Sequence, residues 1–103
     1  MDLVKLRKAV KIKNINWYKH SLERMMEREI YRENVTEVIL KGEVIEDYSE
    51  DKPYPSALIL GWINKKPLHV VVAWDAEKEN CNIITAYYPD LKHFKNDYKT
   101  RKK

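Results

Sequence analysis

The sequence predicts one α+β domain over residues 1–103, with N-terminal helices, a four-stranded antiparallel meander and a short C-terminal helix. Two observations predict it. Apolar residues recur at helical spacing up to Gly42 and alternate with polar residues after it. Short polar turns then separate the alternating segments, as in a meander. Hydrophobic residues make up 44% of the chain, which is enough to form a core. The length of 103 residues is too short for two domains.

The first fifteen residues fit two patterns. Leu3, Leu6 and Val10 recur at helical spacing among lysines and arginines. Val10 and Ile12 also alternate with lysines, as in a strand. We favour a short basic amphipathic helix within residues 2–15.

Two further helices are expected over residues 17–29 and 35–41. Asn34 suits the N-cap of the second helix, and Glu37 stands where a capping box has its acid. Gly42 is a typical residue just beyond a helix C-terminus. The positions expected to pack are Leu22, Met25 and Met26 in the first helix and Val35, Val38 and Ile39 in the second.

Four strands are expected after Gly42, because the apolar period becomes two. Val44 and Tyr48 should share one face of the first strand. Pro89 should stop the last strand, and Asp90 should cap a basic helix over Leu91–Lys99. The expected strands are Glu43–Tyr48, Ser56–Ile63, Leu68–Trp74 and Cys81–Tyr88.

Charge is distributed unevenly along a chain whose formal net charge is +4. Residues 1–19 carry six Lys or Arg against one acid, and residues 92–103 again carry six against one. Between them, eight basic residues face fourteen acids. Basic ends suit a polyanion such as RNA or DNA, but they also keep a small protein in solution. Charge alone favours the second explanation.

Several classes of protein are excluded. No apolar run approaches the roughly 18 residues that span a bilayer, and the basic N-terminus lacks the apolar stretch of a secretory signal. Cys81 is the single cysteine, which indicates a reducing cytoplasm. His20, His69 and His93 are scattered and no glycine-rich phosphate loop occurs, so neither metal nor cofactor is expected.

His20, Arg24 and Arg28 form one column on the helix expected over residues 17–29, at i, i+4 and i+8. Guanidinium groups bind phosphate bidentately and histidine titrates near neutral pH, so this column suits an anion. The alternative is a solvated helix face on which Glu23 and Glu27 pair diagonally with the arginines.

His69 lies inside the most apolar strand and faces away from Leu68 and Val70. A histidine in a strand is more often a satisfied, half-buried residue than a catalyst. Thr85 and Tyr87 share one face of the last strand, and antiparallel pairing would bring His69 near them.

The sequence contains five ordered blocks within about residues 17–101, namely His20–Arg28, Gly42–Tyr48, Lys52–Ser56, Pro67–Ala73 and Ile84–Asp90. Together they resemble a small bacterial and archaeal family long labelled a domain of unknown function. Members of that family are often encoded beside a YgiT-type zinc-finger antitoxin, and the family resembles the RelE/MqsR/BrnT group of metal-independent mRNA endoribonuclease toxins.

The resemblance implies a RelE-like fold and the toxin of a type II toxin–antitoxin system. Such a toxin cleaves mRNA through attack of the ribose 2′-OH on the adjacent phosphate, without cofactor or metal. The implied partners are RNA, including ribosome-bound mRNA, and a cognate antitoxin such as a YgiT-type zinc-finger protein, with no membrane. The implied catalytic residues are His20, Arg24, Arg28 and His69, and the implied substrate-binding residues are Thr85, Tyr87, Tyr88 and Arg101.

One position departs from the family pattern. The last block usually reads T-x-Y-R-P-D, but Tyr88 stands here in place of the arginine. Arg101 or a C-terminal lysine would have to supply the missing cation. The departure favours a noncatalytic RNA- or protein-binding relative as the alternative, and a toxin that acts on something other than mRNA is a third hypothesis.

Overall fold

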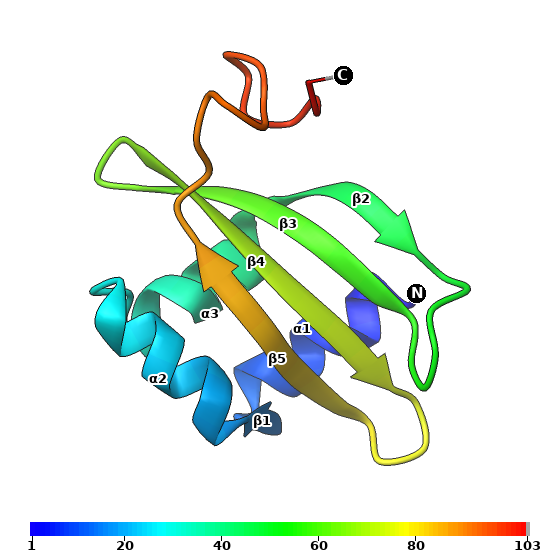
Figure 1. The fold of residues 1–103 in the computed structure, drawn as a ribbon. Coiled ribbons are helices and arrows are strands. Elements are labelled where there is room, and N and C mark those ends of the chain that lie inside the picture. Colours follow the sequence, from blue (N-terminus) through cyan, green and yellow to red (C-terminus); the bar gives the residue numbers. More distant parts are fainter. Residues whose placement is uncertain (103) are drawn as a thin grey trace.

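The structure is a computed structural model that describes residues 1–102, and Lys103 lies outside it. Within those residues it contains three helices and a five-stranded mixed sheet (Figure 1). The α+β class is therefore confirmed. The elements are α1 (Leu3–Lys11), β1 (Ile15–Trp17), α2 (Lys19–Glu27), α3 (Arg32–Lys41), β2 (Glu43–Tyr48), β3 (Ser56–Ile63), β4 (Lys66–Asp75) and β5 (Asn80–Tyr87).

The sheet has the order β1-β5-β4-β3-β2. Strands β2 to β5 form the expected antiparallel meander, and the bounds of β2 and β3 are those predicted. A fifth strand, β1, was not expected. Its three residues pair in parallel with Cys81–Ile83 of β5, so the sheet is mixed rather than purely antiparallel.

The helices follow the predictions with three corrections. Helix α2 begins two residues late, since Trp17 belongs to β1, and it ends two residues early, because Glu29 takes a left-handed φ of 57°. Met26 does not pack and is 80% exposed. Helix α3 begins at Arg32, so Asn34 is not its N-cap and Glu37 is not the acid of a capping box. Asn34 itself takes the capping-box position, and its side chain accepts from the Tyr31 backbone N–H at 3.3 Å. No helix within residues 1–102 has the length and apolarity needed to cross a membrane.

All three helices pack against one face of the sheet and enclose a single core. Leu6 of α1, Val35 and Ile39 of α3, and Val70 of β4 are completely buried. Gly42, which joins α3 to β2, lies very close to the backbone of α3: a Cβ on Gly42 would stand 2.4 Å from the carbonyl oxygen of Val38. Only glycine fits there without a shift of the backbone.

The first strand of the meander contains a bulge between Val44 and Glu46. Val44 pairs with Ile59 and packs against the core, whereas Tyr48 pairs with Ser56 on the other face. The prediction that Val44 and Tyr48 share a face is therefore wrong. One extra residue in a strand reverses the faces of all residues after it.

The helix expected over Leu91–Lys99 does not form. Asp90 Oδ1 accepts from the backbone N–H groups of Lys92 and His93 at 3.0 Å each. Asp97 Oδ1 does the same for Lys99 and Thr100, and Tyr98 adopts a left-handed φ of 57°. Such side-chain bonds offer the backbone an alternative to helix, and a nine-residue helix is marginal without packing. Residues 90–102, hereafter the C-terminal segment, fold back at one end of the sheet (Figure 1).

Candidate functional site

The face of the sheet opposite the helices, hereafter the open face, carries three rows of side chains across the strands. The rows follow from the register of β2 to β5, since paired residues point to the same face. The first row is Glu43, Leu60, His69 and Tyr87; the second is Glu46, Leu58, Val71 and Thr85; the third is Tyr48, Ser56, Ala73 and Asn82. This arrangement confirms that His69 lies beside Tyr87.

His69 is completely buried, and both ring nitrogens are engaged. Nε2 lies 2.7 Å from the carbonyl oxygen of Tyr98, which can only accept, so Nε2 carries the hydrogen. Burial lowers the pKa of His69, which keeps the ring neutral at pH 7. Nδ1 is then an acceptor for the hydroxyl of Tyr87, 3.3 Å away.

Glu46 joins two parts of the chain that are far apart in sequence. Its carboxylate accepts from Arg101 Nε at 2.6 Å and from Arg101 Nη2 at 3.0 Å, and also from the hydroxyl of Tyr48. These bonds, that of Arg101 above all, lower the pKa of Glu46, so it is ionised at neutral pH. Hydrogen bonding to Glu46 correspondingly raises the pKa of Tyr48.

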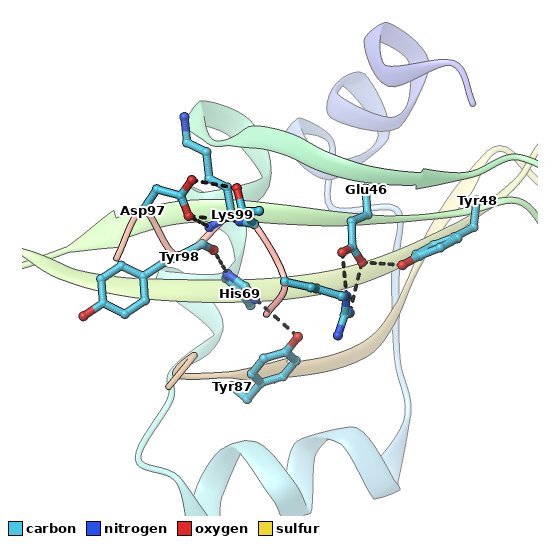
Figure 2. A network of polar contacts seen from close by, with 9 residues as sticks. Glu46, Tyr48, His69, Tyr87, Asp97, Tyr98 and Lys99 are labelled. Carbon is cyan, nitrogen blue, oxygen red and sulfur yellow. Dashed lines mark hydrogen bonds and ion pairs between the residues drawn. The ribbon is translucent and has the colours of Figure 1, made fainter. Parts of the chain in front are cut away.

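The C-terminal segment holds Arg101 in this position. Phe94 is buried against the His69 ring, with centroids 4.7 Å apart, and the Arg101 guanidinium lies 5.0 Å from the Phe94 centroid. Lys99 adds an ion pair of 2.9 Å with Glu43. Figure 2 shows Glu46, His69 and Tyr87 presented from three strands towards this segment. Glu46, Tyr48, His69, Tyr87 and Arg101 are called the Glu46 cluster below.

Helix α2 lies along the edge of β5 that β1 leaves unpaired. Ser21 Oγ donates to the carbonyl oxygens of Ile83 and Ile84, at 3.0 and 2.8 Å. Arg28 Nη1 donates to the carbonyl of Ala86 at 2.8 Å and approaches Thr85 Oγ1 at 3.3 Å. Arg28 therefore reaches the second row of the open face, opposite Glu46, and its Nε and Nη2 donors take no part in these bonds.

The rest of the predicted column is exposed. The side chains of His20 and Arg24 make no hydrogen bond or ion pair within residues 1–102, although they share a helix with Arg28. The structure therefore brings Arg28, Thr85, Tyr87, His69 and Arg101 together, and it leaves His20 and Arg24 on the adjoining flank of α2.

Tyr88 and Arg101 line a hollow of about 240 Å³ beside the Glu46 cluster, together with Tyr87, Pro89, Asp90, His93 and Phe94. Tyr88 is 43% exposed, and Lys66 Nζ lies 5.8 Å from its ring centroid. A lysine and Arg101 thus provide positive charge near the position where the family pattern has an arginine.

Sequence reasoning did not single out Glu46 or Tyr48. Glu46 and Tyr48 are two positions apart in β2, and this spacing predicts that their side chains lie on the same face of the strand. The ion pair between Glu46 and Arg101 could not be predicted from the sequence, because it depends on the fold of the C-terminal segment. Within residues 1–102, no three His, Cys, Asp or Glu side chains are placed as a metal site.

The Glu46 cluster combines an ionised carboxylate, neutral phenols and a guanidinium on one face, with the guanidinium of Arg28 opposite. Burial raises the pKa of Tyr87, so its phenol is protonated at neutral pH. Such a set can bind a phosphodiester, remove a proton from a hydroxyl and return one to a leaving oxygen.

Comparison with known proteins adds the family. Residues 17–88, well over half of the chain, match a family described as Domain of unknown function (DUF4258), which agrees with the family label that the sequence blocks indicated. Neither the curated proteins nor the solved structures gave a match. The chain belongs to the DUF4258 family of domains of unknown function.

Proposed function

We propose that this protein is an endoribonuclease that binds RNA across the open face and cleaves it without a metal ion, as the toxin of a type II toxin–antitoxin system. One observation supports this most directly. Glu46 and Arg101 stand at one end of the second row, and Arg28 and Thr85 stand at the other. A base and a pair of guanidinium groups therefore flank a common floor, in which Leu58 is buried and Val71 is half-buried.

The scissile phosphate lies between Arg28 and Arg101. Each guanidinium uses only part of its five N–H donors in the protein: Arg28 uses Nη1, and Arg101 uses Nε and Nη2. The remaining donors can take non-bridging oxygens and stabilise the charge that develops on phosphorus. Because both arginines are already held by other contacts, little side-chain entropy is lost when they bind.

Glu46 is the general base. Its pKa is lowered by Arg101, so it is ionised and ready to accept the proton of the ribose 2′-OH. When the phosphate binds the free donors of Arg101, its negative charge offsets the positive charge of the guanidinium beside Glu46, and the carboxylate becomes more basic. Substrate binding therefore activates the base.

Tyr87 is the general acid. It approaches from β5, across the floor from Glu46 on β2, and an in-line displacement needs acid and base on opposite sides of phosphorus. Its 3.3 Å contact with His69 is weak enough for the hydroxyl to turn towards substrate. The 2′-oxygen bonds to phosphorus as the bond to the 5′-oxygen breaks; the phenol protonates that oxygen, giving a 2′,3′-cyclic phosphate and a 5′-hydroxyl.

His69 is a positioning residue in this proposal, because its ring is buried and its Nε2 hydrogen is committed to Tyr98. It orients Tyr87 and anchors the C-terminal segment that carries Arg101. His20 and Arg24, which lie exposed on the flank of α2, contact phosphates next to the scissile one. Tyr88 contacts a neighbouring nucleotide from the hollow beside the cluster.

The toxin role implies a cognate antitoxin, a YgiT-type zinc-finger protein being one option, that covers the open face. An acidic or helical segment laid over Arg28 and Arg101 would neutralise both. Coexpression with the neighbouring reading frame should relieve growth arrest, and the variant Arg28→Ala should bind that partner more weakly than Arg24→Ala does.

One observation favours the noncatalytic alternative. Glu46 and Arg101 already satisfy one another, which is also what a purely structural ion pair does. In that alternative the open face binds RNA or a protein without chemistry, and Glu46 serves only to hold the C-terminal segment.

The test is cleavage of a labelled RNA by the purified protein and by two isosteric variants. Glu46→Gln removes the base, and Glu43→Gln removes a second ion-paired glutamate of the open face. We expect the wild type to give a 2′,3′-cyclic phosphate product. Glu46→Gln should lower the cleavage rate by a factor of about 100 or more, and Glu43→Gln should leave the rate unchanged. Salt-sensitive RNA binding without a cyclic product would support the noncatalytic alternative. Equal rates for all three folded proteins would overturn the assignment of Glu46.

A further inference from the structure

A second hollow lies at the other end of the open face from the C-terminal segment. Its volume is about 320 Å³. Val71, Ala73 and Ile84 form an apolar floor on β4 and β5, and the rings of Tyr18 and Tyr54 stand beside it. The remaining lining residues are Asp51, Lys52, Pro53 and Ser56.

One of the two tyrosines, Tyr18, is held in place by a hydrogen bond. The hydroxyl of Tyr18 donates to Asn82 Oδ1 at 3.0 Å, and the buried amide of Asn82 is fixed in turn by Asn16 and the carbonyl of Ala73. Tyr54 lies near Asp75, whose negative charge raises the pKa of the Tyr54 phenol. Because the ring of Tyr18 is already oriented, it loses little entropy when a flat ligand stacks on it.

The charged groups of the hollow complement a purine edge. Asp51 Oδ2 accepts from Ser56 Oγ at 2.5 Å, which positions the carboxylate and leaves Oδ1 without a protein donor within residues 1–102. Lys52, the next residue, brings an ammonium donor to the same loop. Guanine offers two adjacent donor groups beside one acceptor along its Watson–Crick edge, whereas adenine, cytosine and uracil each offer only one donor group there.

We propose that this hollow binds a purine base of the RNA, and guanine most tightly, by stacking on Tyr18 and Tyr54 and by hydrogen bonding to Asp51. The proposal rests on the proposed function, because it identifies the base that accompanies the scissile phosphate. The hollow and the cleavage site share Val71, which lines the hollow and forms the floor of the second row.

The spacing suits a short RNA segment. Ala73 in the hollow lies four residues along β4 from His69, which corresponds to about 13 Å at the rise of a strand. Val71 lies halfway between them. One or two nucleotides span that distance, so a base in the hollow places a neighbouring phosphate at the Glu46 cluster.

The experiment measures binding, with no cleavage involved. The dinucleotides GpG, ApA, CpC and UpU, each 2′-O-methylated so that the attacking hydroxyl is absent, are titrated against the full chain by NMR. We expect GpG to bind about tenfold more tightly than UpU or CpC, with ApA between them. The resonances that shift should be those of Tyr18, Tyr54 and Val71.

Three variants separate stacking from edge recognition. Tyr54→Ala should lower the affinity for GpG about tenfold, because base–aromatic stacking is lost. Asp51→Asn should reduce the preference for GpG over ApA to about twofold or less, since the carboxylate acceptor is gone. Tyr31→Ala, an exposed tyrosine outside the hollow, should leave both affinities unchanged. Asp51 is exposed, so its variant keeps the test decisive if Tyr54→Ala does not fold.

The outcomes distinguish this proposal from the proposed function. Equal affinities for all four dinucleotides, or tighter binding of pyrimidines, would overturn the purine site even if the protein cleaves RNA. Selective binding of GpG that depends on Tyr54 and Asp51 supports the site even if no cleavage occurs. Binding of none of the four probes would overturn the site.

Discussion

The two faces of the sheet are built for different purposes. The face under the helices is a continuous apolar layer in which Val70 and Ile83 are completely buried. On the open face the neighbouring strand positions are His69, Val71 and Thr85, and the C-terminal segment covers the end at His69. The difference indicates that most of the buried apolar core lies under the helices, whereas the open face carries the polar side chains of the candidate site.

Several titratable groups on the open face have pKa values that depart from their ordinary values. The pKa of Glu46 is lowered by Arg101, that of His69 is lowered by burial, and that of Tyr87 is raised by burial. On the helix face the titratable Cys81 thiol is simply buried, which raises its pKa to about 12 and keeps it unreactive. Clustered shifts of both signs on one surface are typical of a functional site.

The largest effect on stability should come from a matched pair in β4. Val70 faces the core and Val71, its neighbour, faces the open side and is half-buried. We expect Val70→Ala to lower the free energy of unfolding by about 2–3 kcal/mol and Val71→Ala by less than about 1 kcal/mol. Urea unfolding measures both, and equal losses would contradict the division of roles between the faces.

A second pair tests the edge where the faces meet. Arg28→Ala removes the donor to the Ala86 carbonyl, so we expect a loss of about 1–2 kcal/mol in the free energy of unfolding. Arg24→Ala removes an exposed side chain of the same helix and should cost less than about 0.5 kcal/mol. The same unfolding assay applies. If Arg24→Ala proves the more costly, Arg28 does not support the edge of β5.

The pH dependence of stability should reflect the open face. Protonation of Glu46 and of His69 is disfavoured in the folded state, since both pKa values are lowered. The unfolded chain therefore binds more protons, and stability should fall as pH drops below about 6.5, continuing through the acid range. Melting temperatures from pH 7 to pH 3 check this. Glu46→Gln should flatten the acid part of the curve, and a curve identical to that of wild type would refute the contribution of Glu46.

The smallest effects concern the two ion pairs of the C-terminal segment. Arg101 makes two bonds to Glu46 and lies against Phe94, whereas Lys99 makes one exposed contact with Glu43. Arg101→Ala should speed amide exchange within residues 93–102 about fivefold, and Lys99→Ala should not change it measurably. The reverse ranking would show that Glu46 does not hold the segment.

The parts of the fold that depend on local pattern could be predicted. The meander followed from alternation after Gly42, and α3 followed from the stripe of Val35, Val38 and Ile39. Strand β1 could not be predicted, because three residues carry no period and their partner in β5 is about 65 positions away. The C-terminal segment was misread for a related reason: its lysines fit a helix, but Asp90 and Asp97 bond to the backbone instead.

The candidate site shows the same limit. Pattern was sufficient to place His69 beside Tyr87 and to single out Arg28, and the departure from the family pattern at Tyr88 drew attention to Arg101. Glu46 remained hidden, since a bulge sets the face it occupies and a distant segment provides its partner. Bulges and long-range ion pairs are properties of the folded chain.

The central claim is that RNA binds the open face. Titration of isotopically labelled protein with a 2′-O-methylated RNA, which cannot be cleaved, tests it most directly by NMR. We predict that the resonances of Val71, Thr85 and Tyr87 shift, whereas those of Val4 and Met26, exposed apolar side chains on the helices, do not. Shifts confined to the helices, with none on the open face, would contradict the account.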